Sequence, residues 1–180
     1  MKLLSLLESI EIFYHGSNTK IEKFTLDFLS SSTNIDQEGP GIYLTSSEKD
    51  AMMYGHYLHK VSVKIVKSRM MPEKRMLNPT FVSHLISKAP NYVDNMTNWA
   101  ENINKARRLA TDAIMSAYGP SDYREAMESI WGDHYRNDSK VWLNTMVSKG
   151  WDGFILDRAD IFHEKSKHLI VFNPEILTIL

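Results

Sequence analysis

Short runs with the pattern of strands lie in the first third and the last part of the chain, whereas the middle repeats apolar residues at helical spacing. Four short runs have the apolar content or the period of two that is typical of strands: residues 11–16, 61–65, 154–157 and 168–172. From residue 80 to 149 the apolar positions recur every three or four residues, with breaks at Pro90, Gly119-Pro120 and Gly132. This order of strands, helices and strands predicts an α+β fold. We expect a single domain, residues 1–180, with a helical insertion at about 80–149.

The N-terminal region has weaker patterns. Apolar residues from Leu3 to Ile10 follow helical spacing, which predicts a short amphipathic helix before the first strand. Residues 21–36 contain scattered apolar side chains without a clean period, and we expect a loop there.

One stretch combines a turn, a strand and a helix start. Residues 39–41 (Gly-Pro-Gly) predict a turn, and Ile42-Tyr43-Leu44 predicts a short buried strand. Thr45-x-x-Glu48 then has the form of a capping box, in which both side chains satisfy backbone N–H groups of a new helix. Tyr54 follows on that predicted helix. Two tyrosines, one on the strand and one on the helix, could form the walls of a slot, or both could be ordinary core aromatics.

Composition narrows the class of protein. With 180 residues, of which 43% are hydrophobic, the chain can bury a substantial core. The absence of cysteine excludes disulfides and thiolate zinc sites and suits a reducing cytoplasm. A net charge of −1 gives no general electrostatic case for nucleic acid or an anionic membrane, although a local basic patch stays open. Glu8 and Glu11 interrupt the apolar N-terminus, which is too short for a signal or a membrane span, so we expect a soluble cytoplasmic protein.

Common catalytic motifs are missing. His56-x-x-His59 has no obvious third ligand, and His163-Glu164 followed by His168 does not form the zinc motif His-Glu-x-x-His, so we expect no metal. The chain has no Gly-x-Ser-x-Gly elbow and no phosphate-binding loop motif. His15-Gly16-Ser17 ends the first predicted strand, where the histidine could bind a sugar hydroxyl and the glycine could admit a planar amide. An ordinary strand end followed by a turn explains the same residues.

Three motifs in order resemble the NAD-binding core of ADP-ribosyltransferases. They are Phe13-Tyr-His-Gly-Ser17, residues 39–45 with Tyr54 eleven residues after Tyr43, and the C-terminal runs Gly150–Phe154 and Leu169–Pro174. The resemblance is to the histidine-tyrosine subgroup, which includes diphtheria toxin, the poly(ADP-ribose) polymerases and small phage-borne or polyvalent-protein transferases. It covers both ends of the chain and not the helical middle. It implies split antiparallel β-sheets and NAD as the co-substrate.

The resemblance also implies a role for each matching residue. His15 would hold a hydroxyl of the nicotinamide-side ribose, and the backbone of Gly16 would pair with the carboxamide. Tyr43 and Tyr54 would pack the nicotinamide ring. Smaller contacts are implied for two hydroxyl residues, Ser17 and Thr45.

Two positions depart from the pattern that the resemblance implies. Ala51 stands where family members often have serine. His168 stands where the catalytic glutamate usually precedes the penultimate strand, and Glu164 is the nearest carboxylate upstream. Loss of this glutamate in related enzymes is associated with mono- rather than poly-ADP-ribosylation, or with inactivity. His168 could serve as a hydrogen-bonding group or base, or it could be a surface histidine at a strand start. Further candidate carboxylates are Asp157, Asp160 and Glu175.

The expected function is therefore that of a NAD-dependent mono-ADP-ribosyltransferase acting on a protein target. The subgroup suggests a phage effector that inactivates a host factor in the host cytoplasm. The helical insertion would contact the target, or it would serve only as a lid or scaffold. Two alternatives stay open: a NAD glycohydrolase, which transfers ADP-ribose to water, and a catalytically inactive binding module.

Overall fold

The computed structural model describes residues 8–25, 40–72, 78–89, 103–118, 123–135, 138–159 and 165–180. The chain divides into two compact units, which we call the sheet unit and the helical unit. The sheet unit comprises residues 1–28, 41–72 and 146–180, and the helical unit comprises residues 29–40 and 73–145.

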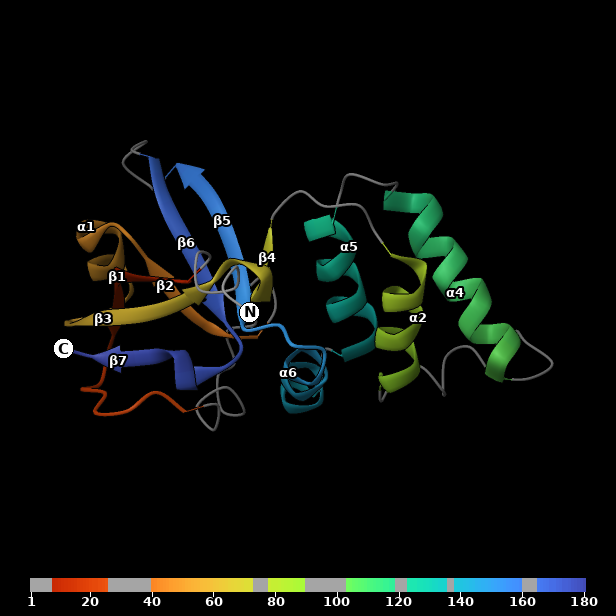
Figure 1. The fold of residues 1–180 in the computed structure, drawn as a ribbon, viewed down its shortest axis with the longest axis horizontal. Helices are drawn as coiled ribbons and strands as arrows, with labels where there is room; N and C mark the ends of the chain where they lie inside the picture. The colour runs from red at the N-terminus through yellow and green to blue at the C-terminus, as the bar shows by residue number, and fades with distance from the viewer. Residues whose placement is uncertain are drawn as a thin grey trace, which may run out of the picture. The chain divides into compact units, whose positions relative to one another are not determined.

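The sheet unit is built on one seven-stranded sheet with the order β4-β5-β6-β2-β1-β3-β7 (Figure 1). The strands are β1 (Glu8–Ser17), β2 (Ile42–Thr45), β3 (Tyr57–Val66), β4 (Met70–Pro72), β5 (Gly153–Ala159), β6 (Lys165–Val171) and β7 (Leu177–Ile179). Neighbouring strands are antiparallel except β4 and β5, which are parallel. The expected α+β class agrees with this mixed sheet, but the expected split into separate antiparallel sheets differs from the single hydrogen-bonded order of the described strands.

Strict alternation builds the core on one face of this sheet. Val61, Val63 and Ile65 of β3 are at most 2% exposed, whereas Lys60 and Lys64 between and beside them face solvent. The buried cluster on that face also contains Phe13, Phe24, Ile42, Leu44, Met70, Leu169 and Val171. Burying each large aliphatic side chain contributes about 1.5–3 kcal/mol, so this face holds the sheet unit together.

The junction between β1 and β2 is much shorter than the junction between β1 and β3. β1 pairs with β3 along its whole length, from Glu8 to Ser17. With β2 it shares a single residue pair, Tyr14 opposite Thr45. Beyond this pair the backbones of β1 and β2 no longer form a ladder, and this is where His15 follows in the chain.

The helix expected at residues 3–10 is wrong for its last three residues. Glu8, Ser9 and Ile10 belong to β1 and lie opposite Val66, Ile65 and Lys64 of β3. Cross-strand pairing therefore overrides the helical spacing of the apolar residues. Residues 1–7 lie outside the described part of the chain.

The helical segment after β2 is short and begins later than expected. Helix α1 (Glu48–Ala51) continues directly into a 3-10 turn, Met52–Tyr54. Ser47, not Thr45, is its N-cap, and the Ser47 hydroxyl accepts a hydrogen bond from the Asp50 amide at 3.3 Å. Thr45 stays in β2, and its hydroxyl accepts the Ser47 amide at 3.1 Å.

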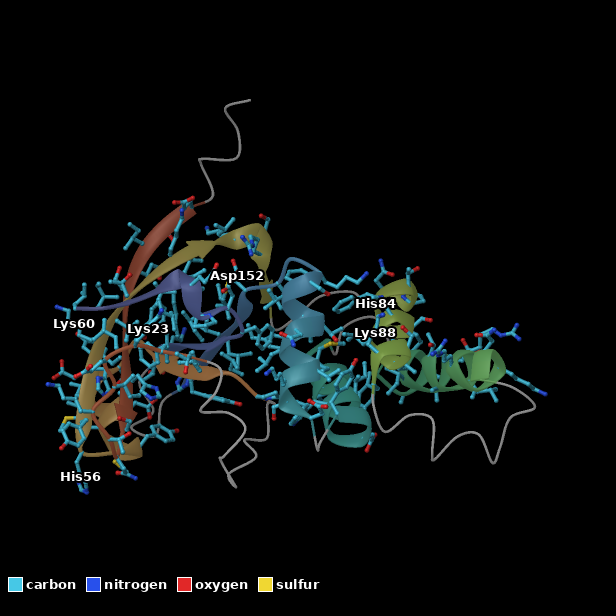
Figure 2. All side chains as sticks on the ribbon, turned by 90° about the horizontal axis from the view of Figure 1, so that it is seen from below. Lys23, His56, Lys60, His84, Lys88 and Asp152 are labelled. Carbon is cyan, nitrogen blue, oxygen red and sulfur yellow. The ribbon has the colours of Figure 1, made fainter. Side chains whose placement is uncertain are left out.

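A buried aspartate ties together the C-terminal strands. The Asp152 carboxylate accepts from Arg69 Nη2 at 2.6 Å and from Asn173 Nδ2 at 3.0 Å, and Asp152 is labelled in Figure 2. Its backbone joins the same segments, because the Asp152 amide donates to the Arg69 carbonyl and its carbonyl accepts from the Phe172 amide. These bonds fix the chain entering β4 and leaving β6 against the start of β5.

The helical unit contains the predicted helical block. Its helices are α2 (Pro79–Lys88), α4 (Ile103–Tyr118) and α5 (Tyr123–Ile130), followed by a π-helical segment (Trp131–Tyr135) and by α6 (Ser139–Ser148), whose last residues belong to the sheet unit. Asp138 caps α6, and its side chain accepts the Val141 amide at 2.9 Å. The buried Tyr135 hydroxyl donates to the Leu85 carbonyl, and burial raises the pKa of Tyr135. Within the described residues, no helix is long and apolar enough to cross a membrane. That the block is an insertion in a single domain stays a prediction.

Candidate active site

His15 lies where β1 and β2 stop pairing, and a side-chain bond replaces the backbone ladder there. His15 Nδ1 lies 2.8 Å from the carbonyl oxygen of Tyr43. A carbonyl only accepts, so Nδ1 carries the proton. Burial lowers the pKa of His15, an effect that the Tyr43 bond opposes and the neighbouring His59 reinforces. The ring is therefore neutral at neutral pH, and its Nε2 is a hydrogen-bond acceptor.

Two aromatic rings fix the plane of the His15 imidazole. The ring of Phe24 meets it edge-on, with centroids 5.3 Å apart and an interplanar angle of 89°. His59, directly opposite on β3, has its ring centroid 6.1 Å away. With rotation restricted on both sides, the Nε2 of His15 has a defined direction.

His59 is a site residue that sequence reasoning missed. It is only 6% exposed, and its Nε2 lies 3.1 Å from the Ser17 hydroxyl. Because Ser17 donates its hydroxyl proton to the Thr19 carbonyl, His59 must be the donor in the pair. His59 lies two residues before buried Val61 in a run with a period of two. This spacing could have placed His59 on the core face of the sheet.

Gly16 is required by packing against the helical segment. A Cβ on Gly16 would lie 1.7 Å from the Ala51 carbonyl oxygen, so the backbone of α1 occupies that space. Gly55 is equally constrained, since its Cβ would lie 2.1 Å from the Ser17 carbonyl carbon. Two glycines thus let the segment that carries Tyr54 lie directly against the end of β1. The predicted pairing of the Gly16 backbone with a carboxamide stays a prediction.

The two tyrosines differ in their surroundings. Tyr43 lies on β2 opposite Ile170 and is half-buried, and it points away from the core face because its neighbours Ile42 and Leu44 are in the core. Tyr54 lies in the 3-10 turn and is 65% exposed. This exposure excludes Tyr54 as a core aromatic, whereas a wall of a binding slot stays a prediction for both residues.

His168 lies on β6 opposite Thr45 of β2. Its Nε2 is 2.8 Å from the Ser166 hydroxyl and 3.4 Å from Asp50 Oδ2. Asp50 is 1% exposed, and sequence reasoning missed it. The signal was available, because Ser47-x-x-Asp50 has the same form as the capping box assigned to Thr45 and Glu48.

The other candidate carboxylates are less informative. Glu164 and Asp160 lie outside the described residues. Asp157 is in β5 opposite Lys167 of β6, and Glu175 is exposed in a 3-10 turn. Among the described residues, no group of three or more histidines and acidic residues is placed to hold a metal ion.

Sequence comparison identifies the family. Residues 9–177 match the family described as ADP-ribosyltransferase in polyvalent proteins, so the chain belongs to that family of ADP-ribosyltransferases. A search of curated proteins gave no match. Among solved structures, a crystal structure of an anti-CRISPR protein aligns with 14% sequence identity and a TM-score of 0.36, covering 94% of this chain and 93% of that one.

Proposed function

We propose that the protein is a NAD-dependent mono-ADP-ribosyltransferase that modifies a protein target. The observation that carries the proposal is the bond between His15 Nδ1 and the Tyr43 carbonyl. It fixes the neutral tautomer whose Nε2 accepts a hydrogen bond, and a ribose hydroxyl of NAD is a donor of the right kind. Family membership supports NAD as the co-substrate.

The neighbouring residues divide the remaining binding tasks. The Gly16 backbone would pair with the carboxamide, and the rings of Tyr43 and Tyr54 would pack the nicotinamide. Ser17 can serve NAD only as an acceptor, because its proton is committed to Thr19. Thr45 accepts the Ser47 amide and keeps its hydroxyl proton for donation.

The reaction breaks the bond between ribose C1′ and nicotinamide, and a protein side chain then takes the ADP-ribose. Such a cleavage has a glycoside-like transition state with positive charge on the sugar. Packing of the leaving ring between aromatic side chains would orient it and keep water from C1′. The histidine at position 168 in place of a glutamate supports transfer of a single ADP-ribose rather than a polymer.

The target and the setting are parts of the same proposal. The helical unit, which has no counterpart in the motifs of the NAD site, would recognise the protein target. A phage effector acting on a host factor in the host cytoplasm fits the kind of family to which the chain belongs.

Mass spectrometry of candidate targets tests the proposal. The protein, NAD and each candidate are incubated, and we expect one candidate to gain the mass of one ADP-ribose. His15→Ala should abolish the gain. His56→Ala is the matched control, since His56 is exposed at the periphery of the sheet unit (Figure 2) and should leave it intact.

Each other outcome contradicts the proposal in a distinct way. Free ADP-ribose without a modified protein would indicate a NAD glycohydrolase. Binding of NAD without release of nicotinamide would indicate an inactive binding module. Modification of the target by His15→Ala would show that His15 is not part of the NAD-binding site.

A further inference from the structure

A second histidine is buried directly beside the strand end that carries the candidate site. His59 of β3 lies opposite His15 of β1 and is only 6% exposed. The next two inward-facing residues of β3, Val61 and Val63, are aliphatic and 0% exposed. A polar ring at this depth loses its hydration, which is costly unless a partner replaces the water. An aliphatic side chain would suit the position better, so packing alone does not account for an imidazole there.

The contacts of His59 lead to both side chains that flank Gly16. His59 Nε2 lies 3.1 Å from the Ser17 hydroxyl, and the ring centroids of His59 and His15 are 6.1 Å apart. Phe24 meets both imidazoles edge-on, with centroid distances of 5.3 Å to His15 and 6.4 Å to His59. The alternation of residues along β1 and β3 places His15, Ser17 and His59 on one face of the sheet.

His59 determines which hydrogen bonds Ser17 can still make. A hydroxyl has one proton and two lone pairs. The proton of Ser17 goes to the Thr19 carbonyl, which can only accept, so one lone pair must accept the Nε2 proton of His59. The second lone pair has no partner among the described residues. A donor on β3 therefore holds Ser17 in the orientation in which it can only accept a hydrogen bond from a ligand.

His59 also helps to keep His15 uncharged. Burial lowers the pKa of His15, and the neighbouring His59 lowers it further. The other groups that face His15 are the Tyr43 carbonyl and the Phe24 ring, and neither carries a charge. A proton on one of two neighbouring imidazoles disfavours a second proton on the other. The pair therefore keeps the Nε2 lone pair of His15 available.

We propose that His59 is a positioning residue of the NAD site, which fixes the hydrogen-bond direction of Ser17 and holds the His15 ring in place. The inference rests on the proposed transferase function. It adds the class of ligand group that these two side chains take. His15 Nε2 and the Ser17 hydroxyl both present lone pairs, so they bind a neutral donor, such as a ribose hydroxyl or an amide N–H. An anionic group would meet two acceptors and no positive charge.

Two substitutions of His59 separate positioning from packing. His59→Leu loses the donor but suits the apolar face of β3, whereas His59→Gln retains a side-chain N–H. We expect His59→Leu to stay folded and to weaken NAD binding by about tenfold, and His59→Gln to stay within about threefold of wild type. Calorimetric titration measures binding, and circular dichroism melting verifies the fold. A merely structural role predicts that the leucine variant binds as tightly as wild type.

A control and a kinetic measurement accompany these variants. Lys64→Gln lies on the same strand but on its exposed face, and it should leave NAD binding within about twofold of wild type. In nicotinamide release, His59→Leu should raise KM more than it lowers kcat, because the lost interaction positions groups that hold the substrate.

A double-mutant cycle tests whether His59 acts through Ser17. Ser17→Ala removes the hydroxyl that His59 holds. In that background His59→Leu should weaken NAD binding by less than about threefold, rather than by about tenfold. An equal effect of His59→Leu in the presence and in the absence of the hydroxyl would overturn the action through Ser17.

NMR spectroscopy tests the inference without turnover. Long-range proton–nitrogen spectra should show the proton of His59 on Nε2 and that of His15 on Nδ1. His59→Leu should raise the pKa of His15. Nicotinamide riboside, which has hydroxyl donors and no phosphate, should shift the ring signals of His15, whereas sodium sulfate should not. A His59 proton on Nδ1 would overturn the link to Ser17, and a shift with sulfate would overturn the ligand class.

The outcomes distinguish this inference from the proposed function. A wild type that neither binds NAD nor releases nicotinamide would overturn the transferase, and the inference with it. A wild type that does both, together with a folded His59→Leu of equal NAD affinity, would overturn only the positioning role. The same holds if His59→Gln binds NAD as weakly as His59→Leu.

Discussion

His15 Nδ1 lies 2.8 Å from the Tyr43 carbonyl oxygen, and this bond joins β1 to β2 beside the one residue pair that their ladder contains. The relationship has two consequences that mutation can separate. One nitrogen of the ring bonds to the backbone of β2, and under the proposed function the other would bind the ligand.

Substitution of His15 by asparagine should separate these two tasks. The shorter amide retains a donor for the Tyr43 carbonyl and loses the distal nitrogen. We expect the free energy of unfolding to stay within about 1 kcal/mol of wild type, and nicotinamide release to fall by about 100-fold or more. Chemical denaturation and a nicotinamide assay measure the two effects. Equal activity in His15→Asn would mean that Nε2 does not contact the substrate.

The stability of the protein should depend on the ionisation of His15. Burial lowers its pKa in the folded protein below the ordinary value of 6.5. As the pH falls below about 6.5, the unfolded chain binds a proton that the folded protein does not, so the free energy of unfolding decreases until the lowered pKa is reached. We expect His15→Gln to reduce this decrease between pH 7 and about pH 5.5, by at most about 1.4 kcal/mol per pH unit. If the free energy of unfolding changes equally with pH in wild type and His15→Gln, the dependence on His15 ionisation is contradicted.

Gly16 should tolerate no side chain. Its Cβ would lie 1.7 Å from the Ala51 carbonyl oxygen, so Gly16→Ala has to move α1 away from β1. We expect a loss of about 2–3 kcal/mol or more in the free energy of unfolding. Gly132→Ala is the control, because a Cβ there meets nothing within 4 Å, and it should change stability by less than about 1 kcal/mol. Equal effects of the two changes on thermal unfolding would argue against the close contact.

The buried and exposed ion pairs of the sheet unit should differ in their contribution to stability. Asp152 is 1% exposed and binds Arg69 and Asn173, so Asp152→Ala should cost about 2–4 kcal/mol. Glu11 forms an exposed pair with Lys167 at 2.9 Å, and Glu11→Gln should cost less than about 1 kcal/mol. Denaturant unfolding of the two variants measures the difference. A cost for Asp152→Ala no larger than that for Glu11→Gln would contradict the structural role of Asp152.

The alternation of residues predicted the strands well where both strand partners have a clear apolar face. Val61, Val63 and Ile65 lie on the core face as their spacing indicates. The spacing from Leu3 to Ile10 misled, because pairing of Glu8–Ile10 with β3 is a long-range interaction that no local pattern contains. The mixed sheet was not predicted for the same reason, because the parallel pair of β4 and β5 is a long-range pairing of segments far apart in sequence.

The sequence predicted those residues of the candidate site that stand in motifs. It did not predict the residues that come close to the site only through folding. His15 and Tyr43 stand in motifs, although the bond between them depends on the divergence of β1 and β2. Neither Asp50 nor His59 stands in one of the motifs that resemble the NAD-binding core. Each becomes a site residue only because folding buries it beside a histidine. Ser47 rather than Thr45 caps helix α1, because the ladder of β2 and β6 holds Thr45.

Nicotinamide release from NAD tests the central claim most directly. Wild type, His15→Ala, Tyr43→Ala and the control His56→Ala are compared, each with and without candidate target proteins. We predict release by wild type and by His56→Ala at rates within about twofold of each other, and a decrease of about 100-fold or more in the other two variants. Release by wild type that is no faster than release by His15→Ala would contradict the assignment of this site as the centre of an ADP-ribosyltransferase.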